Sequence, residues 1–131
     1  MKRILRNKDA GNFLVRYYKS FCHALSGIWY ALKCEHNMII IFVAAIVVVT
    51  AGLFLNLSAY EWLFCIMSFG MVSATEMINT SIEAVVDLET QKYHPLAKIA
   101  KDTASSATLI FSITAFIGAL IIFLPKILEL L

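Results

Sequence analysis

The chain has 131 residues, of which 60% are hydrophobic and 15% are charged, and its mean hydropathy is +0.79. So small a polar fraction cannot cover the surface of a soluble globule, and the composition therefore predicts a small integral membrane protein. The net charge of +2 is too low to favour nucleic acid as a partner.

The N-terminal part of the chain combines basic residues with an amphipathic pattern. Five basic residues lie near the N-terminus, ahead of the first apolar run: Lys2, Arg3, Arg6, Lys8 and Arg16. No compact apolar core with a cleavage site follows them, so we expect no cleavable signal peptide. Apolar residues then recur at helical intervals: Phe13, Tyr17, Phe21, Ala24, Ile28 and Leu32. This pattern predicts an amphipathic helix over about 12–35 at the membrane interface, and a helix that merely anchors the chain is the alternative.

Three apolar runs follow, at about 38–57, 59–86 and 104–124, and each is long enough to cross a bilayer. No repeat or Pro/Gly-rich linker divides them, so the chain is predicted to be one all-α domain over 1–131. The link between the first two runs has no Lys or Arg, whereas the second link contains Lys92, Lys98 and Lys101. The positive-inside rule therefore predicts a cytoplasmic N-terminus and second link, with the C-terminus outside.

A polar stripe interrupts the second apolar run. Glu76, Asn79, Glu83 and Asp87 are spaced by three, four and four residues, which brings them to one face of a helix. Because a carboxylate near mid-bilayer costs roughly 2.5 to 3.5 kcal/mol, this face must meet protein, water, metal or substrate. A bond between helices is the alternative role for Glu76 and Asn79.

Other polar residues are predicted to meet this stripe at the cytoplasmic interface. Glu35 lies just before the first span, and the segment that enters the third span contains Tyr93, His94, Lys101, Asp102, Ser105 and Ser106. Carboxylates that meet lysines suit a site for Mg²⁺ and a polyphosphate, although the chain has no known phosphate-loop motif. The alternatives are a solvated Glu35, a turn role for His94 and an exposed pair of Lys101 with Asp102.

The three cysteines, Cys22, Cys34 and Cys65, are far apart in the sequence and odd in number. We interpret them as free thiols with a packing role.

The segment ATEMINTSIEAVVDLETQKYHPLAKIAKDTASSA resembles the prokaryotic diacylglycerol kinase family, the small bacterial membrane lipid kinases. The pattern is E-x-x-N-[ST]-x-I-E-x-x-V-D, followed by Y-H and by A-K-D-x-x-[SA], and the resemblance covers essentially the whole chain. The segment HPLAKIAKD is more similar to the Gram-positive branch of the family, whose members favour undecaprenol.

The resemblance implies a homotrimer in the bacterial cell membrane, with sites shared between subunits, and roles for individual residues. Glu76 matches the catalytic base, Asn79 and Ser105 match lipid-site positions, and Glu35 with Glu83 matches the Mg²⁺ ligands. Asp87 is a supporting residue. Including the Mg²⁺ ligands, the expected ATP-binding positions are Arg16, His23, Glu35, Glu83, Lys92, Tyr93, His94, Lys101 and Asp102; Arg16 is also expected near the lipid.

The sequence thus predicts a kinase that moves the γ-phosphoryl group of ATP onto undecaprenol, with diacylglycerol as the alternative acceptor. An ion or proton pathway lined by Glu76 and Asp87 is a rival from another class. Residues 63–72 carry no charge, however, and this would interrupt a polar lane. A structural or regulatory membrane peptide is a further rival, but it leaves the group of Glu35, Glu83 and Lys101 unexplained.

Overall fold

The computed structural model describes residues 13–130, and the basic residues Lys2, Arg3, Arg6 and Lys8 lie outside this range. The described part is helical and has no strand. Its elements are α1 (Phe13–Cys34), α2 (His36–Phe54), α3 (Ala59–Glu89) and α4 (Pro95–Leu128). The prediction of an all-α fold is therefore confirmed. The second and third apolar runs belong to helices that are longer than the runs themselves.

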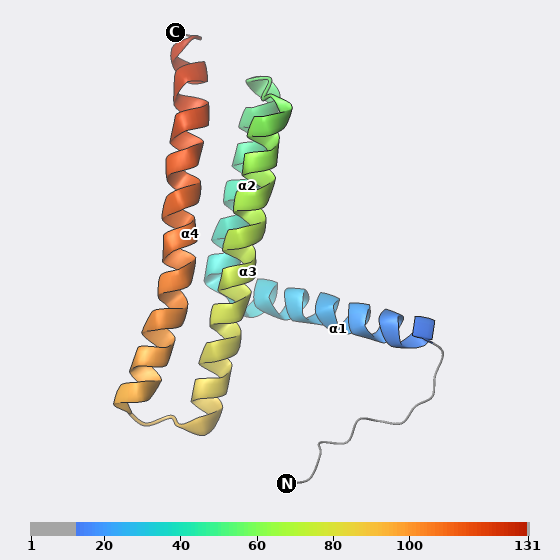
Figure 1. The fold of residues 1–131 in the computed structure, drawn as a ribbon, viewed down its shortest axis with the longest axis vertical. Helices are drawn as coiled ribbons and strands as arrows, with labels where there is room; N and C mark the ends of the chain where they lie inside the picture. Colours follow the sequence, from blue (N-terminus) through green and yellow to red (C-terminus); the bar gives the residue numbers. More distant parts are fainter. Residues whose placement is uncertain (1–12, 131) are drawn as a thin grey trace.

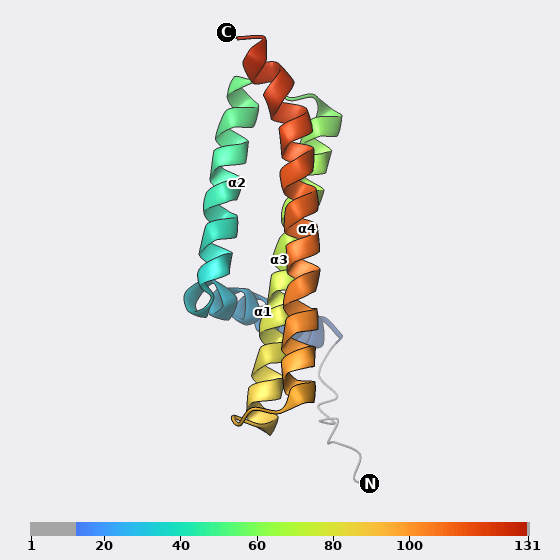
Figure 2. The ribbon, with the colours of Figure 1, turned by 90° about the vertical axis from the view of Figure 1, so that its left-hand side faces the viewer.

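Three of the helices run alongside one another, and α1 extends to one side of them. Helices α2, α3 and α4 alternate in direction, and α1 leaves the start of α2 at a steep angle (Figures 1 and 2). The α3–α4 pair makes the most extensive contact. The connection between α3 and α4 projects beyond the level of α1 (Figure 1), so one end of this hairpin stands clear of the other two helices.

Local signals explain where the helices begin. The Ser58 side chain accepts a hydrogen bond from the Glu61 backbone N–H, while the Glu61 carboxylate accepts one from the Ser58 backbone N–H, which forms a capping box at α3. The turn before it includes Asn56 in the left-handed region with φ 50°. At α4, His94 is the N-cap and Pro95 occupies the first turn, where its missing N–H is tolerated.

Most large apolar side chains lie on the surface of the single chain, on every helix. Water does not favour so much exposed apolar surface, whereas hydrocarbon does. Helices α2, α3 and α4 are each long and apolar enough to cross a membrane. The chain is therefore a membrane protein, as its composition predicts.

A glycine lies in the α3–α4 contact where the first half of α3 packs against the last part of α4. A Cβ atom at Gly118 would lie 1.9 Å from Cζ of Phe64, so the Phe64 ring packs directly against the α4 backbone. The same end of the pair carries an ion pair between Lys126 Nζ and Glu61 Oε2 at 3.2 Å. Close approach at small residues is a usual way for membrane helices to associate.

We expect the substitution Gly118→Ala to destabilise the fold by about 1 to 3 kcal/mol, because the added methyl group overpacks this contact. The measurement is the thermal unfolding midpoint in detergent micelles. Gly70→Ala is the matched control, since a Cβ at Gly70 meets nothing within 4 Å. Equal midpoints for the two variants would show that Phe64 moves aside without cost.

Candidate active site

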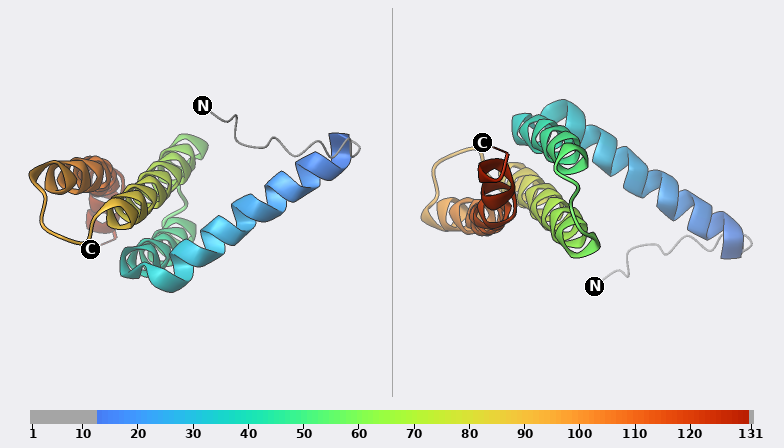
Figure 3. Two further views of the ribbon diagram at one scale, coloured as in Figure 1. Left: turned by 90° about the horizontal axis from the view of Figure 1, so that it is seen from below. Right: turned by 90° about the horizontal axis from the view of Figure 1, so that it is seen from above.

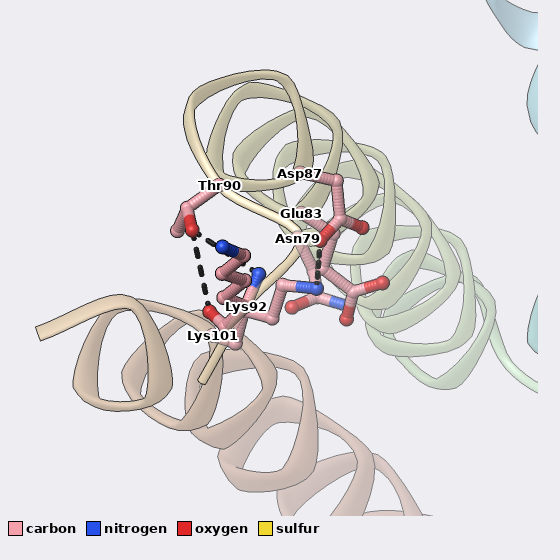
Figure 4. A network of polar contacts seen from close by, with 6 residues as sticks. All are labelled: Asn79, Glu83, Asp87, Thr90, Lys92 and Lys101. Carbon is pink, nitrogen blue, oxygen red and sulfur yellow. Dashed lines mark hydrogen bonds and ion pairs between the residues drawn. The ribbon is translucent and has the colours of Figure 1, made fainter. Parts of the chain in front are cut away.

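The predicted polar stripe lies along one face of α3 with a gradient of burial. Glu76 is 2% exposed and Asn79 is 7% exposed, while Glu83 is half-buried and Asp87 is exposed. The Asn79 Nδ2 group donates a hydrogen bond to Glu83 Oε1 at 3.1 Å. Figure 4 shows Asn79, Glu83 and Asp87 following one another along α3, with Lys101 reaching toward them from α4. A single helix face thus leads from the buried carboxylate to the exposed one.

The buried end of the stripe opens into a polar cavity of about 460 Å³ between α2, α3 and α4. Its lining includes Glu76, Asn79 and Ser105, three residues that the sequence assigns to the lipid site. Four further polar residues line it: Asn37, Ser106, Thr108 and Ser112. The Asn37 Nδ2 group donates a hydrogen bond to Glu76 Oε1 at 2.8 Å, which connects the start of α2 to α3.

An ion pair connects α3 and α4 near their joined ends. Lys101 Nζ lies 2.5 Å from Asp87 Oδ1, although both side chains remain partly exposed. Asp102 pairs instead with Lys98, one helical turn earlier in α4. The alternative of a Lys101–Asp102 pair is therefore wrong, because consecutive residues on a helix point in different directions. The ion pair holds the Lys101 side chain beside the exposed end of the α3 stripe.

Three residues that the resemblance assigns to the nucleotide lie exposed in the connection between α3 and α4: Lys92, Tyr93 and His94. The His94 Nδ1 atom accepts a hydrogen bond from the Leu96 backbone N–H at 3.3 Å, so this ring caps α4 in addition to any contact with a ligand. The Lys92 backbone N–H donates to Thr90 Oγ1 at 3.2 Å, and the Lys92 side chain is exposed. Tyr93 is 81% exposed.

Two of the expected nucleotide residues are not brought to this site within one chain. Arg16 lies in the first turns of α1 and lines a shallow depression formed by α1 residues alone, namely Phe13, Arg16, Tyr17 and Ser20. This end of α1 points away from the α3–α4 hairpin (Figure 3). His23 is exposed further along α1. The site of a single chain therefore lacks these two side chains.

The residues near Glu83 have the chemistry that Mg²⁺ requires. Among residues 13–130, no three His, Cys, Asp and Glu side chains gather closely enough to hold a metal ion by themselves. Mg²⁺ usually needs only one or two protein carboxylates and completes its shell with phosphate oxygens and water. The Asn79 Oδ1 atom is buried without a hydrogen-bond partner beside Glu83, and Glu35 makes no capping bond to α2. The oxygens of Asn79 and Glu83 on α3 fit an ion that arrives with a nucleotide. Glu35 lies between α1 and α2, and among residues 13–130 no hydrogen bond or ion pair connects it to them.

Sequence reasoning missed Asn37, Thr108 and Ser112. The signal for Asn37 is an amide in the first turn of a span whose next residues are apolar. The hydroxyls of Thr108 and Ser112 give no such signal, because Ser and Thr in membrane helices usually bond their own backbone. Thr108 Oγ1 has no such bond and is buried without a partner.

The three cysteines are free, as interpreted from the sequence, and Cys22 and Cys34 are exposed.

The fold and this cavity define a class of protein: a small helical membrane protein whose polar site lies toward one end of its spans. Residues 22–123 match the family described as prokaryotic diacylglycerol kinase, and the chain belongs to this family. It is therefore a lipid kinase, as the resemblance implies.

The chain is similar to several lipid kinases, and two of them match more than nine-tenths of its length. It is 43% identical to an undecaprenol kinase of Bacillus subtilis over 120 residues, which cover 92% of this chain and 98% of that protein. It is 38% identical to a diacylglycerol kinase of Synechocystis over 131 residues, which cover 99% of this chain and 74% of that protein. The diacylglycerol kinase of Escherichia coli is 39% identical over 75 residues, which cover 57% of this chain and 62% of that protein.

Proposed function

We propose that the enzyme transfers the γ-phosphoryl group of ATP, in a Mg²⁺-dependent reaction, onto undecaprenol to give undecaprenyl phosphate. The observation that carries this proposal is the buried carboxylate of Glu76 in a polar cavity at the end of the apolar helices. The similarity to an undecaprenol kinase over nearly the full chain supports the choice of lipid. Diacylglycerol is the alternative acceptor, supported by the relative of that name.

The proposed reaction begins at the lipid hydroxyl. Glu76 accepts the hydroxyl proton as the lipid oxygen attacks the γ-phosphorus, and the bond from that phosphorus to the β,γ-bridging oxygen breaks to release ADP. Asn79 and Ser105 line the same cavity and hold the lipid headgroup. General-base catalysis matters here because an alcohol is a poor nucleophile, whereas phosphoryl transfer needs mainly positioning and charge neutralisation.

The nucleotide is proposed to lie toward the α3–α4 connection. Lys101 stands over the stripe beside Asp87, and the exposed Lys92, Tyr93 and His94 follow it at the hairpin end. Glu35 and Glu83 would hold Mg²⁺, which supplies positive charge against the phosphate oxygens. The remaining nucleotide contacts are proposed to come from Asp102, Arg16 and His23.

The site is proposed to face the cytoplasm, where ATP is found, with the C-terminus outside a bacterial cell membrane. The lysines of the α3–α4 connection and their absence from the α2–α3 turn support this orientation. Helix α1 would lie in the interface, since it leaves the span direction where α2 begins. Labelling of Lys92→Cys, in a cysteine-free background, by an impermeant thiol reagent in intact cells would contradict this orientation.

The active form is proposed to be a homotrimer of single-domain subunits over 1–131. Its support is the position of Arg16 and His23, which lie on α1 outside the cavity, and the exposed apolar faces of the three spans. Neighbouring subunits would bring these side chains to the site. Mixed trimers of Arg16→Ala and Glu76→Gln subunits should then recover activity, and a lack of recovery would contradict shared sites.

We expect a higher kcat/KM on undecaprenol than on diacylglycerol. A site built for the ester carbonyls of diacylglycerol needs donors that would be left unpaired by a simple alcohol. Four polar groups of the cavity already donate within the protein: Asn37 to Glu76, Asn79 to Glu83, and Ser105 and Ser106 to the Asp102 carbonyl. No Lys or Arg lines the cavity, so no strong donor is left for an ester carbonyl. The measurement is phosphorylation of both lipids by purified protein in one bilayer at matched mole fractions. A tenfold preference for diacylglycerol would favour the alternative.

A further inference from the structure

We infer that Asn37 is a positioning residue for Glu76, and that its amide nitrogen orients this carboxylate toward the lipid hydroxyl. The inference deepens the proposed function, because it rests on the role of Glu76 as the base. Asn37 lies at the start of α2, outside the segment of α3 and α4 that carries the family pattern.

The two oxygens of the Glu76 carboxylate have different roles: one accepts the hydrogen bond from Asn37, and the other is left for the proton of the lipid hydroxyl. Asn37 Nδ2 donates to Glu76 Oε1 at 2.8 Å, across 39 residues of sequence. Within residues 13–130, no other side chain donates a hydrogen bond to this carboxylate. Oε1 is thus occupied, and Oε2 is left to accept a proton. A glutamate has three side-chain torsions, so a fixed oxygen restricts where the other one points.

The chemistry of the amide also suits a base. A nearly buried carboxylate needs a donor to remain charged, because leaving such a group unpaired is costly. A lysine or arginine in this place would hold the carboxylate in an ion pair, which competes with proton uptake from the lipid. A neutral amide donates a hydrogen bond without adding a charge. The α2 N-terminus, which carries Asn37 and has no capping bond from Glu35, adds a favourable dipole.

Packing of Asn37 between α2 and α3 is one competing explanation, and it differs from positioning in what it predicts for substitutions of similar size. Asn37→Leu removes the donor and keeps the bulk of the side chain. Asn37→Asp keeps the shape and replaces the donor with a second acceptor that faces Oε1 of Glu76. If packing alone mattered, at least one of these variants would keep the wild-type turnover.

We expect both variants to lower kcat at least about tenfold, with KM for MgATP and for lipid within about twofold of the wild type. The assay uses purified full-length protein in bilayers with undecaprenol, and thermal unfolding is measured in parallel. His36→Leu is the control, because this neighbouring side chain is exposed at the same helix end. A kcat above half the wild-type value in either Asn37 variant would overturn the inference.

A double-mutant cycle separates positioning from folding. In the Glu76→Gln background there is no base to orient, so adding Asn37→Leu should change the residual rate by less than about twofold. An additional loss as large as that in the wild-type background would show a structural role and overturn the inference. If Glu76→Gln itself keeps its activity, the proposed base is wrong; if only the Asn37 variants keep theirs, the positioning role alone is wrong.

Discussion

The Glu76→Gln variant should fold and bind MgATP, yet transfer phosphoryl groups about 10² to 10⁴ times more slowly than the wild type, because the change removes the base. The amide of the new side chain has nearly the shape of the carboxylate, so the cavity and its contact with Asn37 Nδ2 through the side-chain carbonyl can be retained. The measurement is kcat at saturating undecaprenol and MgATP, with nucleotide binding and thermal unfolding measured on the same preparation.

Glu89→Gln is the matched control for this substitution. Glu89 is the last residue of α3, is exposed and does not line the cavity. It should therefore keep the wild-type turnover. A Glu76→Gln enzyme with more than half the wild-type rate would show that another group takes the proton, or that the lipid hydroxyl needs no base.

The spans and the burial of the α3 stripe follow from simple regularities of the sequence. Apolar runs of sufficient length indicate the membrane helices, and spacings of three and four residues place Glu76, Asn79, Glu83 and Asp87 on one face. The structure adds the gradient along that face, from 2% exposure at Glu76 to an exposed Asp87. The gradient arises because α4 covers α3 along most of its length, while the hairpin end extends past α2.

Contacts between helices were harder to predict. The partner of Glu76 lies 39 residues earlier in the chain, and no local pattern states which face of α2 meets α3. The partner of Lys101 is equally hard to predict from the sequence. The neighbouring Asp102 suggests a local pair, whereas Lys101 pairs with Asp87 on the preceding helix. Pairings of this kind depend on the relative rotation of packed helices, and the period of a single helix does not determine that rotation.

The positions of Arg16 and His23 show a second limit of sequence reasoning. The resemblance assigned both residues to the nucleotide, and the single chain keeps them on α1, away from the cavity. The family resemblance describes an assembled site, whereas helix patterns describe one chain. In the proposed trimer, neighbouring subunits would bring these residues to the nucleotide, and the experiment with mixed subunits tests the trimer and the nucleotide site together.

Removing either proposed Mg²⁺ ligand should raise the Mg²⁺ requirement sharply. We expect Glu35→Ala and Glu83→Ala each to shift the Mg²⁺ titration of activity by at least about tenfold, because each removes an oxygen that would link the ion to the protein. Both should weaken nucleotide binding more than lipid binding, since Mg²⁺ bridges carboxylates and phosphates. Glu83→Ala also frees Asn79 Nδ2 from its 3.1 Å bond, so its effect should be the larger.

The titration separates this role from a general structural one. Glu89→Ala serves again as the exposed control on the same helix, and its Mg²⁺ titration should match that of the wild type. At high Mg²⁺ the two ligand variants should regain part of their turnover, because excess ion compensates for weaker binding by mass action. A loss of turnover that stays constant across the titration would point to distortion of the cavity. An unchanged titration in both variants would mean that the ion is held by the nucleotide and water alone, and that Glu35 and Glu83 have another function.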